Sequence, residues 1–350
     1  MRVLFITVRA DQGGGPKHLL DLARRIKITN QSSFIAIASP DHKPFYSHFL
    51  NVSNEVIKIP PRRFSLITFL RLLSFCKINE IHTVHSHGLG AGIYSRLLGL
   101  FSIHVIHTYH GVHLKQDFSS KLKNYVEKVL SKLDSTLIFV SNSERENAIR
   151  LNYSIGNNYL VIENGIHLKD LEKNVRFSNQ SRIIKICILS RFDPHKNILQ
   201  AIKLFSKAIA EFPNIHLSIA GHGPENRKIK NLIEKSNLVD YTSIYGEIED
   251  SDAFLKEHHF YLSSSLGEGL PYTVLEAMKV GVIPILSNVS CHKDILNKSY
   301  LFSLNEEEQF ISIFRDLVKR DPKSHNFDNI LKTRFDIDYQ IEKVIQLYYR

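Results

Sequence analysis

Cysteine, acidic residues and long hydrophobic runs are all scarce in this sequence. The three cysteines, Cys76, Cys187 and Cys291, are widely separated and odd in number. This pattern argues against a disulfide framework or a thiolate metal site and favours a reducing compartment. No stretch reaches the roughly 18 uninterrupted apolar residues of a membrane span, and the apolar run at the N-terminus is too short for a signal peptide. A cytoplasmic protein without a membrane-spanning helix is therefore expected.

Acidic residues number 35 against 45 lysines and arginines, which gives a formal net charge of +10. Such a charge indicates acidic partners: nucleic acid, anionic lipid or phosphorylated substrates. Nucleic acid is not expected, because no basic motif with interleaved aromatic residues is present. With 350 residues, 43% of them hydrophobic, the chain is expected to form two ordered globular domains.

Apolar, β-branched runs alternate with helix-period segments along almost the whole chain. Strands are expected at 2–8, 33–39, 81–87, 104–110 and 135–141, and in a second series at 183–190, 215–221, 241–246, 260–265 and 282–288. This alternation predicts parallel sheets covered by helices on both faces. The predicted fold is therefore α/β with two doubly wound, Rossmann-like domains. They span 1–166 and 167–335, and a terminal helix at 336–350 is expected to pack on the N-terminal domain.

A glycine-rich loop follows the first predicted strand. Ligands of open parallel sheets bind beyond the carboxyl ends of the strands. Gly13, Gly14 and Gly15 lie at such an end and precede a helix, where bare backbone can approach a phosphate. A flexible turn is the alternative. The spacing is not G-x-G-x-x-G and no acid ends the second strand, which disfavours a dinucleotide-binding fold.

Two loops of the second series have features suited to a phosphorylated ligand. In SRFDPHKN, Arg191 and Lys196 flank a turn, and a guanidinium fork with a point charge suits a diphosphate. Solvated surface charge is the alternative. In the turn after the next strand, Gly221 and Gly223 permit close approach of the backbone.

The stretch SLGEGLPYTVLEAMKVG places two carboxylates around a helix start. Glu268 precedes a helix that begins near Pro271, and Glu276 lies inside this helix between apolar residues. Amides around Gly269 and Leu270 could hold a phosphate. A buried carboxylate needs hydrogen-bond donors, such as the two hydroxyls of a ribose. A glutamate on the exposed face of the helix is the alternative for Glu276.

Together these stretches resemble glycosyltransferase family 4, a large family of retaining enzymes with the GT-B fold. EGLPYTVLEAM, with seven residues between its glutamates, resembles the family's E-x7-E signature, and SRFDPHKN resembles its G-R-x-x-x-x-K-N loop. GGGPKHLLDLA, TYHG, VSNSE and VIENGI resemble further family segments, so the resemblance covers nearly the whole chain. Two departures stand out. Ser190 replaces the usual glycine, and SNVSCHKDIL, which contains His292, replaces a glycine-containing run that ends in P-E.

The resemblance implies a role for each of these residues. Arg191 and Lys196 would neutralise the nucleotide diphosphate, Glu268 would bind hydroxyls of the transferred sugar, and Glu276 would bind the ribose. His110 of TYHG would lie near the sugar and the reacting centre. The predicted catalytic residues are therefore His110, Arg191, Lys196 and Glu268. The predicted donor-binding residues are Gly13, Gly14, Gly15, Gly221, Gly269, Leu270 and Glu276, in a cleft between the domains.

Histidines and acids also raise the question of a metal. Seven histidines lie at 82, 85, 87, 104, 107, 110 and 113, but no thiolate or close carboxylate completes a zinc shell. Residues lining the acceptor side of the cleft are the preferred interpretation. Asp336 and Asp338 form a D-x-D triplet that is better explained as acids at a helix start. No metal and no cofactor are expected.

The segment PRRFSLITFLRLLSFCK (61–77) is basic and amphipathic. Its apolar residues are first interpreted as the core face of a helix. The alternative is docking on an anionic membrane, which would suit a lipid-linked acceptor and peripheral attachment to the inner face of the plasma membrane. The basic residues that would assist are Arg62, Arg63, Arg71, Lys115, Lys121, Lys123 and Lys128.

The predicted function is transfer of a hexose or N-acetylhexosamine from a UDP-sugar, with retention of configuration. The acceptor would be a glycan or a polyprenyl-diphosphate or other lipid-linked glycan in bacterial surface polysaccharide or lipopolysaccharide assembly. One alternative is a nucleotide-sugar epimerase or hydrolase of the same fold, which would turn over without an acceptor. The other is a catalytically silent sugar-nucleotide binding protein, which would bind UDP without turnover.

Overall fold

The computed structural model describes residues 1–11, 13–38, 43–60, 64–112, 118–133, 136–154, 158–168, 183–320 and 325–349. The chain divides into two compact units. The first unit comprises Met1–Gly165 and Asp338–Arg350, and the second unit comprises Ile166–Ile337. Residues 169–182, which follow the predicted domain boundary at 166/167, lie outside the described residues.

The first unit is built on a parallel sheet of seven strands in the order β3-β2-β1-β4-β5-β6-β7. The strands are β1 (Arg2–Thr7), β2 (Ser32–Ile37), β3 (Glu55–Lys58), β4 (Thr83–His87), β5 (His104–Thr108), β6 (Thr136–Phe139) and β7 (Tyr159–Val161). The helices are α1 (Gly14–Ile28), α2 (Pro44–Val52), α3 (Leu66–Ile78), α4 (Leu89–Gly99), α5 (Phe118–Leu130), α6 (Asn142–Arg150) and α14 (Ile337–Gln346). The strand order reverses between β1 and β4, the kind of switch point at which such sheets bind ligands.

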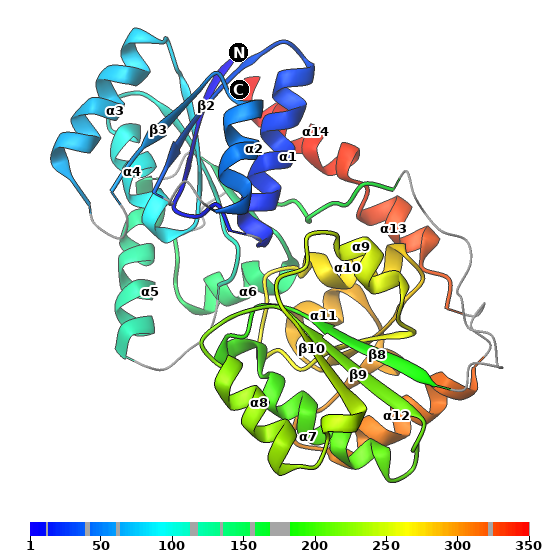
Figure 1. Ribbon diagram of the computed structural model, residues 1–350. Helices are drawn as coiled ribbons and strands as arrows, with labels where there is room; N and C mark the ends of the chain where they lie inside the picture. The colour runs from blue at the N-terminus through cyan, green and yellow to red at the C-terminus, as the bar shows by residue number, and fades with distance from the viewer. Residues whose placement is uncertain are drawn as a thin grey trace. The chain divides into compact units, whose positions relative to one another are not determined.

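Helices cover both faces of this sheet, and β1 and β2 are accordingly buried along most of their length and largely apolar. Figure 1 shows α1 and α2 on one side of the strands and α3 and α4 on the other. Alternation along the strands sends Leu4, Ile6 and Val84 into a core with α3 and α4. His85 points to the opposite face, where its Nδ1 lies 2.6 Å from the hydroxyl of Tyr348.

The C-terminal segment, from α14 onward, supplies Tyr348 and also pairs with α1. Arg25 lies 3.9 Å from Asp338 and 3.8 Å from Glu342. Asp338 belongs to the first turn of α14, and Asp336 forms an isolated parallel bridge with Ile166. The two acids of the D-x-D triplet therefore lie at a helix start, as expected from the sequence.

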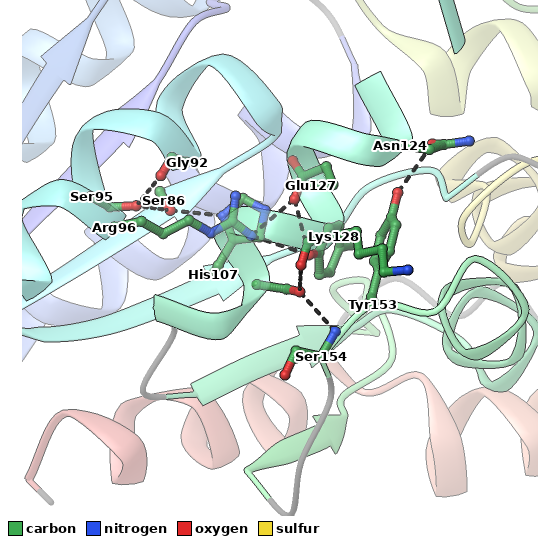
Figure 2. A network of polar contacts seen from close by, with 12 residues as sticks. Ser86, Gly92, Ser95, Arg96, His107, Asn124, Glu127, Lys128, Tyr153 and Ser154 are labelled. Atoms are coloured by element: carbon green, nitrogen blue, oxygen red, sulfur yellow. Dashed lines mark hydrogen bonds and ion pairs between the residues drawn. The ribbon is translucent and has the colours of Figure 1, made fainter. Parts of the chain in front are cut away.

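A buried polar network fastens α4 and α5 to β5 (Figure 2). Arg96 is completely buried and lies 3.0 Å from Glu127, and its guanidinium also donates to the hydroxyl of Tyr109 at 3.1 Å. Ser86 contacts the Nδ1 of His107 at 2.8 Å. Because each charge here has a partner, the network avoids the large cost of an isolated buried ion.

The second unit has a parallel sheet of six strands in the order β10-β9-β8-β11-β12-β13. The strands are β8 (Ile184–Leu189), β9 (Ile215–Ala220), β10 (Thr242–Tyr245), β11 (Phe260–Ser263), β12 (Ile283–Ser287) and β13 (Leu301–Phe302). The helices are α7 (Ile198–Ile209), α8 (Asn226–Lys235), α9 (Ser251–Lys256), α10 (Tyr272–Lys279), α11 (Ser290–Ile295), α12 (Glu307–Lys319) and α13 (Asp328–Arg334). Figure 1 shows α7, α8 and α12 on one side of this sheet and α9 and α10 on the other.

The predicted fold class, two doubly wound α/β units with parallel sheets, is confirmed. Sequence periodicity missed β3, β7 and β13, which are edge strands of four, three and two residues and are too short to show a pattern. Cys76, Cys187 and Cys291 are free and buried, in agreement with the absence of a disulfide framework. Among the described helices, none combines the length and apolarity that crossing a bilayer requires.

Candidate active site

In the second unit, the loops after β8 and β9 pack tightly against each other. The amide of Phe192 donates to the carbonyl of His222 at 2.9 Å. Gly221 has a φ of +138°, and a Cβ at this position would lie 1.9 Å from the carbonyl oxygen of Ser190. A Cβ at Gly223 would lie 2.7 Å from the carbonyl oxygen of Phe192. The close approach that these glycines permit is thus to the loop that carries Arg191 and Lys196.

That loop is also tied to the end of β11. Asn197 adopts a left-handed conformation with φ of 53° at the start of α7, and its carbonyl accepts a hydrogen bond from the hydroxyl of Ser264 at 2.8 Å. The amide of Leu266 donates to the carbonyl of His195 at 2.9 Å. These backbone contacts bring Lys196 to the segment that carries Glu268.

Lys196 and Glu268 form a largely buried ion pair. The hydroxyl of Ser265 donates to the same carboxylate at 2.7 Å. Burial by itself would raise the pKa of Glu268, but the charge of Lys196 and the hydrogen bonds from Lys196 and Ser265 together hold this pKa below its usual value. Glu268 is therefore ionised at neutral pH and accepts two strong hydrogen bonds.

Arg191 lies at the beginning of the same loop and is about half exposed. Its guanidinium contacts the carboxylate of Asp193 at 2.7 Å. Among the described residues it forms no ion pair with Glu268, which pairs with Lys196 instead. Arg191 thus presents an accessible positive charge on the loop, held in place by Asp193.

Glu276 is buried on α10, with only 7% of its surface exposed. Its neighbours Val274 and Leu275 are completely buried, and Leu270, just before the helix, is 4% exposed. The alternative of a glutamate on the exposed face is therefore wrong. The helix ends at Lys279, and Gly281 beyond it has a φ of +77° that suits glycine.

His292 is a neighbour of Glu268 whose role sequence reasoning left open. It is completely buried, and its Nδ1 donates to the carbonyl of Ser287 at 2.8 Å, so Nε2 carries the lone pair. The hydroxyl of Ser287 donates to the carbonyl of Ser265 at 2.7 Å. Burial lowers the pKa of His292, while the bond to Ser287 and the charge of Glu268 oppose this effect. Its Nε2 has no hydrogen-bond partner among the described residues.

In the first unit, His110 and the glycine loop lie together near the carboxyl ends of β1, β4 and β5. Gly13 caps α1 in an extended conformation. A Cβ added to Gly15 would touch the ring of His110 at 3.4 Å. The Nε2 of His110 lies 3.0 Å from the Nδ1 of His87. Burial is the main cause that lowers the pKa of His110 well below its usual value, and the neighbouring His18 and Arg9 add to it, so the ring is neutral at pH 7.

Glu144 of the VSNSE segment holds the loop that follows His110. Its carboxylate accepts backbone amides of Gly111, of Val112 at 3.0 Å and of Val140 at 2.9 Å. Burial raises the pKa of Glu144, and these three hydrogen bonds oppose that rise. The segment therefore fixes the backbone next to His110, a function that the sequence pattern did not reveal.

Comparison with known proteins identifies the family. The model of Glycosyltransferase Family 4 matches residues 12–170, and that of glycosyl transferases group 1 matches residues 169–334. Protein CapJ of Staphylococcus aureus is 27% identical over 63% of this chain and 55% of its own length. The UDP-Gal:alpha-D-GlcNAc-diphosphoundecaprenol alpha-1,3-galactosyltransferase of Escherichia coli is 26% identical over 81% of this chain and 78% of its own. The capsular polysaccharide biosynthesis glycosyltransferase CapH of S. aureus is 24% identical over 99% of this chain and 98% of its own.

Solved structures show the same fold. Anabaena HepE in complex with UDP-glucose superposes with a TM-score of 0.85 at 14% identity, covering 99% of both chains. The lipopolysaccharide outer core galactosyltransferase WaaB superposes with a TM-score of 0.74 at 13% identity, covering 100% of this chain and 99% of that one. Since the two family models together span residues 12–334, this chain belongs to the family 4 glycosyltransferases and has the GT-B fold.

Proposed function

We propose that this chain is a retaining glycosyltransferase that moves a hexose or N-acetylhexosamine from a UDP-sugar to a glycan or lipid-linked glycan acceptor in bacterial surface polysaccharide assembly. The observation that carries the proposal is the buried pair of Lys196 and Glu268 next to Ser265. It places a cation suited to a phosphate beside a carboxylate suited to sugar hydroxyls. The similarity to CapH, a capsular polysaccharide glycosyltransferase, and to the E. coli galactosyltransferase, which is named for a diphosphoundecaprenol-linked acceptor, supports a glycan or lipid-linked glycan as the acceptor.

The proposed mechanism begins with an exchange of partners. The ammonium of Lys196 leaves Glu268 and binds the donor diphosphate. The carboxylate of Glu268 then accepts hydrogen bonds from hydroxyls of the transferred sugar. Arg191, accessible on the same loop, adds a second positive charge to the leaving diphosphate. Catalysis then rests on positioning and on stabilisation of the developing negative charge.

In this mechanism no protein carboxylate acts as the nucleophile. The acceptor hydroxyl attacks the face from which the diphosphate leaves, and the leaving phosphate accepts its proton. His110 is proposed to bind near the sugar and Glu276 to bind the ribose. Lys196 and Arg191 supply the positive charge, so transfer requires no metal. Activity that is lost in chelator and restored by Mn²⁺ would contradict this.

The test of the function is transfer from a panel of UDP- and GDP-sugars to lipid-linked and free glycan acceptors. NMR of the product is expected to show the anomeric configuration of the donor. An inverted linkage would refute retention. Donor turnover without acceptor would favour the epimerase or hydrolase, and UDP binding without any turnover would favour the silent binding protein.

Replacing Glu276 with glutamine is expected to weaken binding of UDP and of UDP-sugars alike by about 10- to 100-fold, since hydrogen bonds to a charged group contribute about 1.5–3 kcal/mol. Isothermal titration with UDP measures the loss. The matched ligand is 2′,3′-dideoxy-UDP, which lacks both ribose hydroxyls and should bind the wild type and the Glu276→Gln variant equally. An unequal response to that ligand, or unchanged UDP affinity, would contradict the ribose contact.

We also propose that this transferase docks on an anionic membrane surface through α3 and α5, which both adjoin α4. The core face of α3 is formed by Phe69, Leu72, Leu73 and Cys76, as expected. Further apolar residues, between 47% and 82% exposed, define what is here called the α3–α5 surface: Leu66, Ile67, Leu70, Leu122, Tyr125 and Val129. Exposed basic residues accompany them, namely Arg71, Lys121, Lys123 and Lys128. Arg62, Arg63 and Lys115 lie outside the described residues.

Changing Ile67 to glutamate is expected to reduce flotation with liposomes that contain anionic lipid, because it removes an exposed apolar side chain and adds a repelled charge. The control is Ile149→Glu, which changes an exposed isoleucine on α6. Flotation that falls equally for both variants, or for neither, would contradict docking through the α3–α5 surface.

A further inference from the structure

Three histidines converge in the first unit from separate parts of the sequence. His18 lies on α1, His87 ends β4, and His110 follows β5. From each side chain one ring nitrogen can be chosen so that all three lie within 4.8 Å of one another. His18 lies far outside the run of histidines at 82–113, so spacing along the chain does not connect it with that run.

The spacing of the rings suits a shared cation. Zn²⁺ binds histidine nitrogen at about 2.0–2.1 Å, so tetrahedral ligand nitrogens lie about 3.3 Å apart. The 3.0 Å contact between His87 and His110 is made by Nδ1 of His87 and not by its unpaired Nε2, so it shows that the rings are close without defining the ligand atoms. The three ring centroids are separated by 5.5 Å (His18 to His87), 5.4 Å (His18 to His110) and 5.3 Å (His87 to His110). These nearly equal separations arrange the three rings as a triangle around a common centre.

Unsatisfied nitrogen atoms point to a ligand independently of this spacing. His18 and His87 are 94% and 96% buried, since their exposed fractions are 6% and 4%. The Nδ1 of His18 and the Nε2 of His87 have no hydrogen-bond partner among the described residues. A buried polar atom without a partner costs about 1–3 kcal/mol. A cation that accepts their lone pairs would remove that cost.

Both a negative and a positive side chain lie near the three histidines, namely Asp21 and Arg9. Together they permit a cation. Burial lowers the pKa of His18 to about 4 despite the nearby charge of Asp21, so the ring is uncharged at pH 7. Asp21 is itself buried and lies three residues after His18 on α1, on the same face of the helix. The negative charge of Asp21 acts to raise the pKa of His18 and so favours positive charge at this ring. Arg9 opposes a cation, but its guanidinium is engaged by Asp11 at 2.8 Å.

We propose that His18, His87 and His110 form a binding site for a divalent transition-metal cation, for which Zn²⁺ is the probe. Three neutral imidazoles suit Zn²⁺, Ni²⁺ or Cu²⁺ and do not suit Mg²⁺ or Ca²⁺. The site shares His110 with the proposed transfer reaction, but Zn²⁺ binding does not depend on that reaction. If that reaction uses His110, occupation of the site by Zn²⁺ inhibits transfer, because the cation takes the ring nitrogen.

The test is metal binding by the full chain without any donor. After treatment with chelator, titration calorimetry is expected to show about one Zn²⁺ per chain, and Zn²⁺ but not Mg²⁺ is expected to raise Tm. Co²⁺ is expected to give the visible absorption of a tetrahedral site. A wild type that binds no Zn²⁺ overturns the proposal, whether or not transfer activity is found.

Variants locate the cation. His87→Asn keeps a polar atom near the position of Nδ1, which contacts His110, but removes Nε2. His18→Gln removes the imidazole whose Nδ1 has no hydrogen-bond partner among the described residues. Since loss of a supporting contact alone costs about 10- to 100-fold in metal affinity, each is expected to weaken Zn²⁺ binding by at least about tenfold. His82→Gln, which changes an exposed histidine of the same unit, should bind like the wild type. Unchanged affinity in folded His87→Asn and His18→Gln overturns the assignment. If a variant fails to fold, the Co²⁺ spectrum of the wild type still decides whether the site is tetrahedral.

Discussion

Replacing Lys196 with methionine is expected to lower the turnover number for glycosyl transfer by about 100- to 1,000-fold, the usual cost of removing one group that stabilises a leaving oxyanion. Methionine keeps the length of the side chain, but it cannot neutralise the diphosphate. The lysine is already largely removed from water beside Glu268. Its electrostatic interaction with a bound diphosphate is therefore screened less than that of a surface lysine. Initial rates at saturating donor and acceptor measure the effect.

The matched control is Lys203→Met, which changes an exposed lysine on the following helix, α7. Its turnover number should equal that of the wild type. A Lys196→Met variant that remains folded and equally fast would contradict the proposed role of the ammonium. Loss of donor affinity with an unchanged turnover number would instead assign Lys196 to binding alone.

The same variant has a second, pH-dependent consequence. Because the folded pKa of Glu268 is held below its ordinary value of 4.5, the ion pair stabilises the folded state above that pH. This contribution is lost as the pH falls through the folded pKa. Lys196→Met should therefore lower the free energy of unfolding at pH 7 more than at acid pH, and denaturant unfolding at both pH values measures the difference.

The fold could be predicted from the sequence because each strand and helix is marked by a pattern within its own short segment. Runs such as VLFI in β1 and ICIL in β8 are buried by helices on both faces, and that burial requires continuous apolar strands. The alternation of such strands with helices then leaves few possible topologies. The short edge strands β3, β7 and β13 contain too few residues to be recognised in this way.

The candidate site was predictable only in part, because side-chain partners are set by the topology. The sequence identified Lys196 and Glu268 separately, but not that two residues 72 positions apart form an ion pair. This pairing depends on the order of β8 and β11, which are neighbours in the sheet although β9 and β10 intervene in the chain. For the same reason His18 was missed, since its proximity to His87 depends on α1 packing across the end of β4.

The last prediction concerns the backbone that holds the Lys196 loop. Gly221→Ala is expected to destabilise the protein by about 3–5 kcal/mol, through strain in the left-handed backbone and steric overlap in a packed region. The added Cβ would lie 1.9 Å from the carbonyl oxygen of Ser190 and 3.1 Å from the ring of Phe192. Neither atom belongs to a flexible side-chain end, so the two loops must separate. Urea denaturation measures the change.

Gly246→Ala provides the control within the same contact. The carbonyl of Gly246 accepts the amide of Gly221 at 3.0 Å, yet a Cβ at Gly246 would meet nothing within 4 Å. That variant should unfold like the wild type, within about 0.5 kcal/mol. Equal stability of the two variants would mean that the loops after β8 and β9 do not pack as described. If only Gly221→Ala is destabilised and its remaining folded fraction also binds UDP weakly, the packing of these loops positions the Lys196 loop for the donor.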